Sequence, residues 1–230
     1  MSTLTPTRRV SRKHELREDR VVTFYARVLG LIENNRTVVY AVLGIIVLGL
    51  ALFFGLSYMQ SLKNTEAQDA MADAVQLYES GEYIQALDGD MFFAGLIEVA
   101  DKYGSTRAGN LAHFYAADAL FRSGDLERSL EYFRSFDKAS NYIGASAYAG
   151  EAAIHETNGD HGQAADLYLR AANTFESAVT SPVYLTQSGR AYEAAGDLSS
   201  AQRIYETLKE DYPTSREGQN ADFYLARLGE

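Results

Sequence analysis

The chain has 230 residues, with 21 Lys and Arg against 31 Asp and Glu, so its net charge at pH 7 is −10, and it contains no cysteine. A sequence without cysteine excludes disulfides, thiolate chemistry, cysteine zinc sites and the acylated cysteine of a bacterial lipoprotein. The acidic balance argues against a nucleic-acid partner, because the protein would repel phosphate.

The first 37 residues are basic, with eight Lys or Arg against four Asp or Glu. Within them Val21, Phe24, Tyr25, Val28 and Ile32 recur at helical spacing, and arginines lie between them. This pattern is typical of an amphipathic helix on an anionic membrane surface. It is equally typical of an ordered lead-in to the apolar segment that follows, and both interpretations stay open.

An uncharged apolar run extends from Val38 to Met59. As a helix, its 22 residues would reach about 33 Å, enough for a hydrocarbon core of about 30 Å. We expect an uncleaved transmembrane helix, since a signal peptide has a shorter apolar run and is followed by an A-x-A cleavage site. A buried core helix is the other alternative, although residues 45–48 leave no polar face. Because basic flanks stay in the cytoplasm, we expect residues 60–230 on the opposite side.

One pattern recurs four times in residues 60–230: a small residue, a glycine seven positions later, and a small residue five positions after that. The four copies are Ala74, Gly81 and Ala86; Ala117, Gly124 and Ser129; Ala152, Gly159 and Ala164; and Gly189, Gly196 and Ala201. An acid follows each central glycine, at Glu82, Asp125, Asp160 and Asp197. The pattern predicts helical hairpins: small residues let two helices approach, glycine ends the first helix, and the acid favours the start of the second. Four hairpins that share faces predict an all-α solenoid.

This spacing, with Pro213 after the last copy, resembles the tetratricopeptide repeat family. The resemblance implies a tetratricopeptide-type solenoid over residues 60–230, with about four helical hairpins and a closing helix at Glu217–Leu228. The first unit departs from the family by an insertion around Asp88–Gly95. The third has Glu151 and His155 where the family has apolar residues.

An enzyme or metal site needs a convergent set of polar side chains, and the sequence shows none. His155 and His161 lack the i,i+4 spacing of a helical metal site, and Asp88 with Asp90 lacks the rest of a calcium loop. We therefore expect no catalytic residue, no cofactor and no metal. A deep pocket with strongly shifted pKa values would revive the enzyme hypothesis.

Two surfaces are candidates for binding other proteins. By the family resemblance, the first helices of the repeats would line a groove with Phe114, Asp118, Phe121, Arg122, Glu156, Arg190 and Glu193. The alternative is that the two phenylalanines pack between repeats and that the charged residues are ordinary solvated charge. The second candidate is the insertion, where Met91, Phe92 and Phe93 would mark an interface if exposed, or else would pack onto the first repeat.

The layout of a basic tail, one membrane helix and an acidic repeat domain resembles the ancillary subunit family of the bacterial Sec translocon. That resemblance implies a single-pass protein of the bacterial inner membrane, with a cytoplasmic N-terminus and a periplasmic repeat domain. It would be an adaptor or chaperone-like factor for protein translocation and envelope biogenesis. Its partners would be translocon proteins, envelope chaperones or extended client segments, with lipid around Val38–Met59 and the basic tail. The alternative is a scaffold subunit of another envelope complex, for secretion, motility or division.

Overall fold

The computed structural model describes residues 35–229, so most of the predicted basic tail, including its candidate amphipathic helix, lies outside the described residues. The described residues form helices and turns, and their β-type pairing is an isolated bridge between Gly89 and Ala94. The predicted all-α class is confirmed. The chain divides into two compact units, Met1–Met59 and Gln60–Glu230, which are considered separately.

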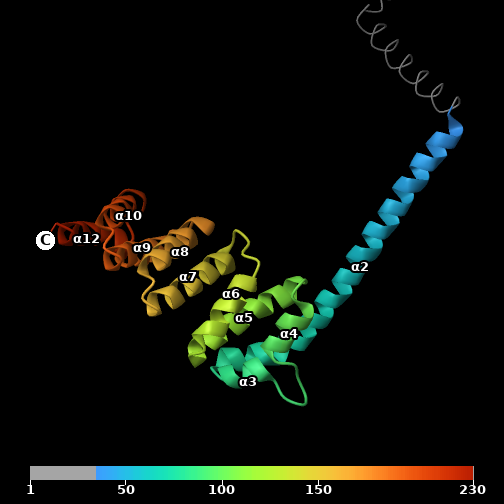
Figure 1. Ribbon diagram of the computed structural model, residues 1–230, viewed down its shortest axis with the longest axis horizontal. Helices are drawn as coiled ribbons and strands as arrows, with labels where there is room; N and C mark the ends of the chain where they lie inside the picture. The colour runs from blue at the N-terminus through green and yellow to red at the C-terminus, as the bar shows by residue number, and fades with distance from the viewer. Residues whose placement is uncertain (1–34, 230) are drawn as a thin grey trace, which may run out of the picture. The chain divides into compact units, whose positions relative to one another are not determined.

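In the first unit the described part is the beginning of helix α2, which runs Arg36–Ser80 (Figure 1). Its apolar side chains are exposed all around the helix, and Ile45 is 70% exposed. The apolar stretch is long enough to cross a membrane, and none of it is buried within the protein. The alternative of a buried core helix is therefore wrong. So much apolar surface would be unfavourable in water, which supports a single transmembrane helix.

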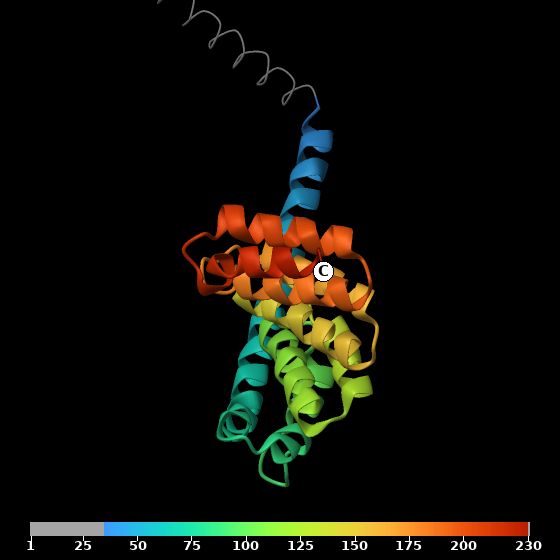
Figure 2. The ribbon, with the colours of Figure 1, turned by 90° about the vertical axis from the view of Figure 1, so that its left-hand side faces the viewer.

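The second unit is a series of helical hairpins, which follow one another in Figures 1 and 2. The rest of α2 pairs with α3 (Tyr83–Asp88) and α4 (Leu96–Tyr103), α5 (Arg107–Ser123) with α6 (Leu126–Ser135), α7 (Tyr142–Thr157) with α8 (His161–Thr174), and α9 (Ser181–Ala194) with α10 (Leu198–Asp211). Successive hairpins share faces, because α5 packs on α4, α7 on α6 and α9 on α8. The predicted α-solenoid is confirmed, and the described residues form four hairpins.

The closing segment differs from the single helix expected, because it forms α11 (Arg216–Gln219) and α12 (Ala221–Arg227). Asn220 separates the two. Its side-chain Nδ2 donates to the carbonyl of Arg216 at 2.8 Å, the acceptor that its own backbone N–H would use in a continuous helix. The backbone N–H of Asn220 turns to Glu217 instead. After this break, α12 packs against α10 and covers the end of the solenoid.

The repeat pattern has the structural role that its spacing predicted. Its small residues are buried where paired helices approach, namely Ala74, Ala86, Ala117, Ser129, Ala152, Ala164, Gly189 and Ala201. Ser129 stands where the other three copies have alanine. Its buried hydroxyl is paired, since its Oγ donates to the carbonyl of Ala117 at 2.7 Å. The central glycines all adopt positive φ, from 79° at Gly196 to 90° at Gly124. Side chains other than glycine are strained in that conformation, so these residues end the first helices.

The acids after the glycines cap two of the four second helices. Asp125 accepts a hydrogen bond from the backbone N–H of Arg128 at 3.2 Å, and Asp197 accepts one from Ser200 at 3.0 Å. Glu82 and Asp160 make no such bond at α3 and α8. The prediction that these acids favour helix starts is therefore confirmed as side-chain caps for α6 and α10.

The polar residues that depart from the family pattern in the third hairpin have partners. Glu151 Oε1 lies 2.8 Å from Lys138 Nζ, and both side chains are only 9% exposed. Lys138 also donates to the carbonyl of Phe133. His155 is buried, with Nδ1 3.4 Å from Asp160 Oδ2. A charge this buried is tolerated only when paired, so Lys138 explains the acid in α7.

Candidate functional site

The predicted groove residues lie on α5, α7 and α9, and the two phenylalanines among them pack into an apolar cluster shared by α5, α6 and α7. The ring of Phe114 is 6.1 Å from that of Phe133 and 5.7 Å from that of Phe136. Phe121 packs against the same cluster, which also contains Ile154. Both side chains are partly buried there. These contacts support the packing alternative for Phe114 and Phe121.

Asp118 of α5 connects the first two hairpins. The hydroxyl of Tyr78 donates to Asp118 Oδ2 at 2.5 Å, and Arg122 Nε donates to the same oxygen at 2.5 Å. The Arg122 guanidinium also lies 5.5 Å from the ring centre of Tyr83. Burial, and then the bonded carboxylate, raise the pKa of Tyr78 above its ordinary value, which keeps the phenol neutral. Asp118 is therefore engaged within the domain, while the Arg122 side chain is still 49% exposed.

The acids predicted on α7 and α9 are engaged in a repeated way. Glu156 accepts a hydrogen bond from Tyr168 at 2.9 Å, and Glu193 accepts one from Tyr205 at 2.5 Å. Burial, followed by this bond, raises the pKa of both tyrosines. Each pair is separated by 12 residues within one hairpin. In the second hairpin Phe121 and Phe133, also 12 residues apart, belong to one apolar cluster. Sequence reasoning missed these pairs, although their common spacing was a signal that could have revealed them.

A similar bond forms at Tyr192, whose hydroxyl donates to Asp166 Oδ1 at 2.5 Å. Burial, with the help of this carboxylate, raises the pKa of Tyr192 to about 12. Tyrosine hydroxyls paired with carboxylates are thus a structural device of the domain. They connect helices while keeping the phenol neutral.

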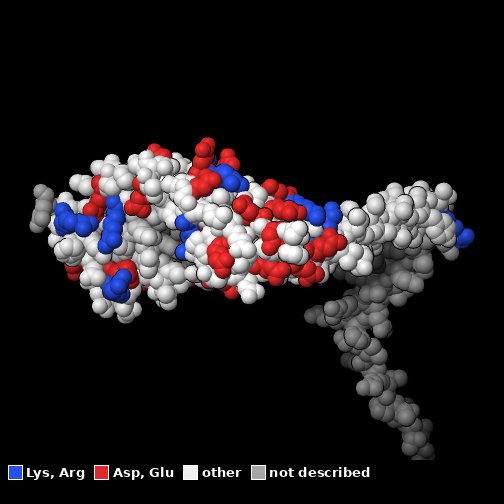
Figure 3. Space-filling model, turned by 90° about the horizontal axis from the view of Figure 1, so that it is seen from below, with Lys and Arg blue, Asp and Glu red and all other residues white. Residues whose placement is uncertain are grey.

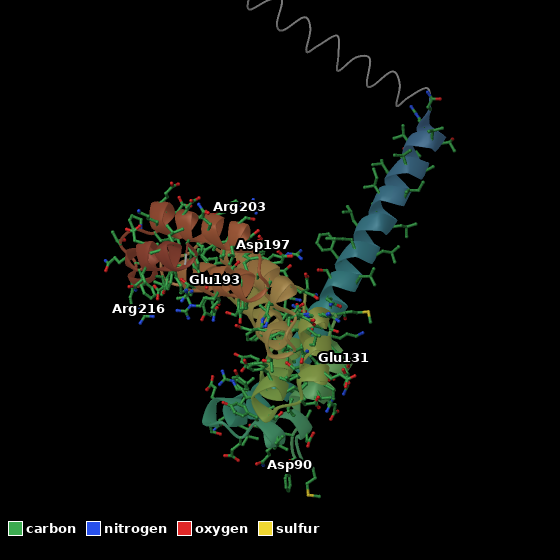
Figure 4. The ribbon with its side chains drawn as sticks, turned by 60° about the vertical axis from the view of Figure 1, so that its left-hand side comes forward. Asp90, Glu131, Glu193, Asp197, Arg203 and Arg216 are labelled. Atoms are coloured by element: carbon green, nitrogen blue, oxygen red, sulfur yellow. The ribbon has the colours of Figure 1, made fainter. Side chains whose placement is uncertain are left out.

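Arg190, another of the predicted groove residues, contacts an aromatic ring. Its guanidinium lies 5.6 Å from the ring centre of Tyr224, and Arg227 approaches the same ring at 5.8 Å. Arg227 donates to both carboxylate oxygens of Glu193 at 2.6 Å. Glu193 lies on α9, in the last hairpin of the domain (Figure 4). The structure therefore brings Arg190 and Glu193 to one region, whereas Glu156 lies on another hairpin.

The insertion interrupts the second helix of the first hairpin between α3 and α4. We call residues 89–95 the insertion turn. Asp90 Oδ1 accepts hydrogen bonds from the backbone N–H of Phe92 at 2.7 Å and of Phe93 at 3.2 Å. Phe93 packs onto the apolar cluster of the first hairpin, whereas Met91 and Phe92 are 87% and 86% exposed. Phe93 thus fits the alternative of packing onto the first repeat, whereas Met91 and Phe92 fit the alternative of an exposed interface.

A depression of about 630 Å³ lies beside the insertion turn. Its lining comes from α3, α4 and α6: Leu87, Asp88, Ile97, Glu98, Asp101, Lys102 and Arg128. Smaller depressions of about 410 and 280 Å³ lie at the turn before α3 and near the ends of α8 and α10. None of these three is lined by a predicted groove residue. Within residues 35–229, no group of three potential metal ligands comes together.

Comparisons with known proteins agree with this architecture. A tetratricopeptide repeat family model matches residues 185–215, which cover most of α9, all of α10 and Pro213. No curated protein matches the chain. Among solved structures, a kinesin light chain protein from Podosopora anserina, whose TPR-like repeats are nearly identical to one another, matches with a TM-score of 0.54. The two sequences are 13% identical, and the match covers 72% of this chain and 86% of that one. A single-substitution variant of the same protein matches equally, with 85% of its chain covered.

The family match and the similar solved structures describe the fold of the repeat domain. The similarity to the solved structures, at 13% identity, shows the fold. The fold is typical of non-catalytic scaffolds, whose repeats bind other proteins. The chain therefore contains one segment, residues 185–215, that matches a tetratricopeptide repeat, within an α-solenoid of tetratricopeptide type.

Proposed function

We propose that this chain is a membrane-tethered adaptor of the bacterial inner membrane, with its repeat domain in the periplasm. The observation that carries the proposal is the unburied apolar stretch of α2 in the same chain as a protein-binding solenoid. A tether of this kind raises the concentration of the repeat domain near other membrane proteins. Weak contacts with the solenoid then suffice for binding.

Charge supports the proposed orientation. Residues 1–37 have a net charge of +4, whereas residues 38–230 have a net charge of −14, which together give the chain its −10. Positively charged flanks are retained in the cytoplasm during insertion. The basic tail is accordingly the cytoplasmic part, and the acidic repeat domain lies outside. The layout of a basic tail, a membrane helix and an acidic repeat domain favours a role as adaptor or holdase beside the translocon, where exported chains emerge.

Photo-crosslinking in native membranes tests this role. A crosslinking amino acid at Arg190, on the exposed side of α9, reports on the predicted groove, and one at Arg122 reports on its other end. The matched control is Glu131, an exposed residue of the second helix α6 (Figure 4). We expect Arg190 and Arg122, but not Glu131, to crosslink to translocon or envelope chaperone proteins. Equal recovery from all three positions, or recovery of neither class, would overturn the assignment.

A second candidate function is that of a scaffold subunit in another envelope complex. The exposure of Met91 and Phe92 favours it, because two large apolar side chains at an insertion are typical of a subunit contact. The same crosslinker at Phe92 distinguishes the two functions. Crosslinks concentrated at Phe92, to secretion, motility or division proteins, would favour the scaffold.

A further inference from the structure

The insertion turn and the depression beside it form one continuous surface. Leu87 and Asp88 line the depression and lead directly into the turn, and Ile97 lines it just after the turn ends. The lining is thus partly apolar, and Met91 and Phe92 of the adjoining turn are exposed to solvent. A hairpin of this fold needs no such insertion, as the other three hairpins show. The exposed pair therefore has no evident role in folding.

The insertion turn is well ordered by its own contacts. Besides the two hydrogen bonds to Asp90 Oδ1, the backbone N–H of Asp90 donates to the carbonyl of Phe93 at 3.1 Å. Gly89 has φ of 68°, and a Cβ on Gly95 would lie only 2.2 Å from the carbonyl oxygen of Leu87. The two ends of the turn are thus held tightly together. Met91 and Phe92 are presented by a preorganised backbone, which lowers the entropy cost of binding.

Charge indicates what kind of partner fits. Acids surround the exposed pair, with Asp88 and Asp90 beside it and Glu98 and Asp101 along the depression. Figure 3, which views the protein from the side of α3, shows acidic side chains crowded over this part of the repeat domain. The basic residues of the depression are Lys102 and Arg128, and Arg128 is 3.7 Å from Asp125. The local charge is therefore negative.

We propose that the insertion turn and the depression dock a segment of a partner protein that combines apolar side chains with Lys or Arg. The apolar side chains would bury Met91 and Phe92, and the cations would face Asp88 and Glu98. An anionic membrane surface fits less well, because the same acids would repel it. The proposal rests on the protein-binding function above and names the chemistry of one partner surface.

Selection from a random 12-residue peptide library tests the proposal without knowledge of the partner. The bait is the full chain in nanodiscs of neutral phosphatidylcholine, and empty nanodiscs remove lipid binders. We expect the selected peptides to carry net positive charge and apolar residues. Their binding should weaken at least tenfold when Met91→Ser and Phe92→Ser are combined. It should weaken several-fold, with less dependence on salt, when Asp88→Asn and Glu98→Gln are combined.

The control is Val179→Ser, which removes an apolar side chain that is 76% exposed outside this surface and should leave binding unchanged. The proposal is overturned if the selected peptides have no positive charge, or if they bind the Met91 and Phe92 variant as tightly as the native chain. Binding of the native chain, but not that variant, to anionic vesicles would identify lipid as the occupant instead. Translocon crosslinks at Arg190 would survive any of these failures, so the proposed function is judged separately.

Discussion

Gly189 of α9 lies so close to Tyr205 of α10 that adding one methyl group at Gly189 should destabilise the last hairpin. A Cβ at Gly189 would lie 2.4 Å from Cε1 and 2.7 Å from Cζ of Tyr205, so the ring would have to move by roughly 0.6 Å to reach even a 3.0 Å contact. Tyr205 is fully buried, and its hydroxyl is bonded to Glu193 at 2.5 Å. The ring therefore has little room to move without losing that bond.

We predict that Gly189→Ala lowers the free energy of unfolding by about 1–2 kcal/mol. Overpacking of this kind costs about 1–3 kcal/mol, and replacing glycine by alanine in a helix returns up to about 1 kcal/mol. The measurement is urea unfolding of the full chain in detergent micelles, followed by circular dichroism. Adding Tyr205→Leu should make the combined loss smaller than the sum of the single losses, because the clash disappears.

The matched control is Gly162→Ala in α8, where a Cβ would meet nothing within 4 Å. With no clash, the helix preference of alanine should raise the free energy of unfolding by about 0.5–1 kcal/mol. Opposite signs for Gly162 and Gly189 are thus the expected result. If both substitutions stabilise the chain equally, the close approach of Gly189 to Tyr205 does not exist and the reasoning is refuted.

Lys138→Met should lower the free energy of unfolding by about 3–5 kcal/mol because it leaves the buried Glu151 carboxylate unpaired, whereas replacing both residues by leucine should restore most of it in the same urea assay. Asp125→Ala should cost about 1 kcal/mol more than Glu82→Ala, because only Asp125 caps its helix; equal thermal midpoints for the two variants would contradict this. The folded-state pKa of Tyr192, about 12, exceeds the ordinary value of 10.0, so its neutral form is favoured by folding. The stability from this tyrosine is complete below pH 10 and is lost as the pH rises from 10 to 12; Tyr192→Phe should weaken that loss in alkaline unfolding, and an unchanged pH slope would count against it.

The sequence predicted the features that depend on neighbours close along the chain. A glycine ending a helix adopts positive φ because of its own missing side chain, so Gly124 and Gly196 could be placed from the spacing alone. The apolar run of α2 needs only its own composition to be recognised. The closing helix was less predictable, because the side chain of Asn220 competes for a backbone carbonyl.

The functional surfaces were less predictable, since a side chain is free to bind a partner only if nothing distant in sequence has already engaged it. Asp118 accepts a hydrogen bond from Tyr78, 40 residues earlier, and Glu193 accepts one from Arg227, 34 residues later. The same holds for the insertion, where Phe93 packs inward while Met91 and Phe92 do not. No local pattern separates these three residues.

By itself, the sequence determined that this chain is helical, repetitive and furnished with an apolar span, because periodicity and composition are properties of short segments. Tertiary structure alone decided which charged and aromatic side chains bind one another and which face the solvent. Those outcomes depend on burial and on partners brought together by the stacking of hairpins, and such contacts are not written in any single repeat.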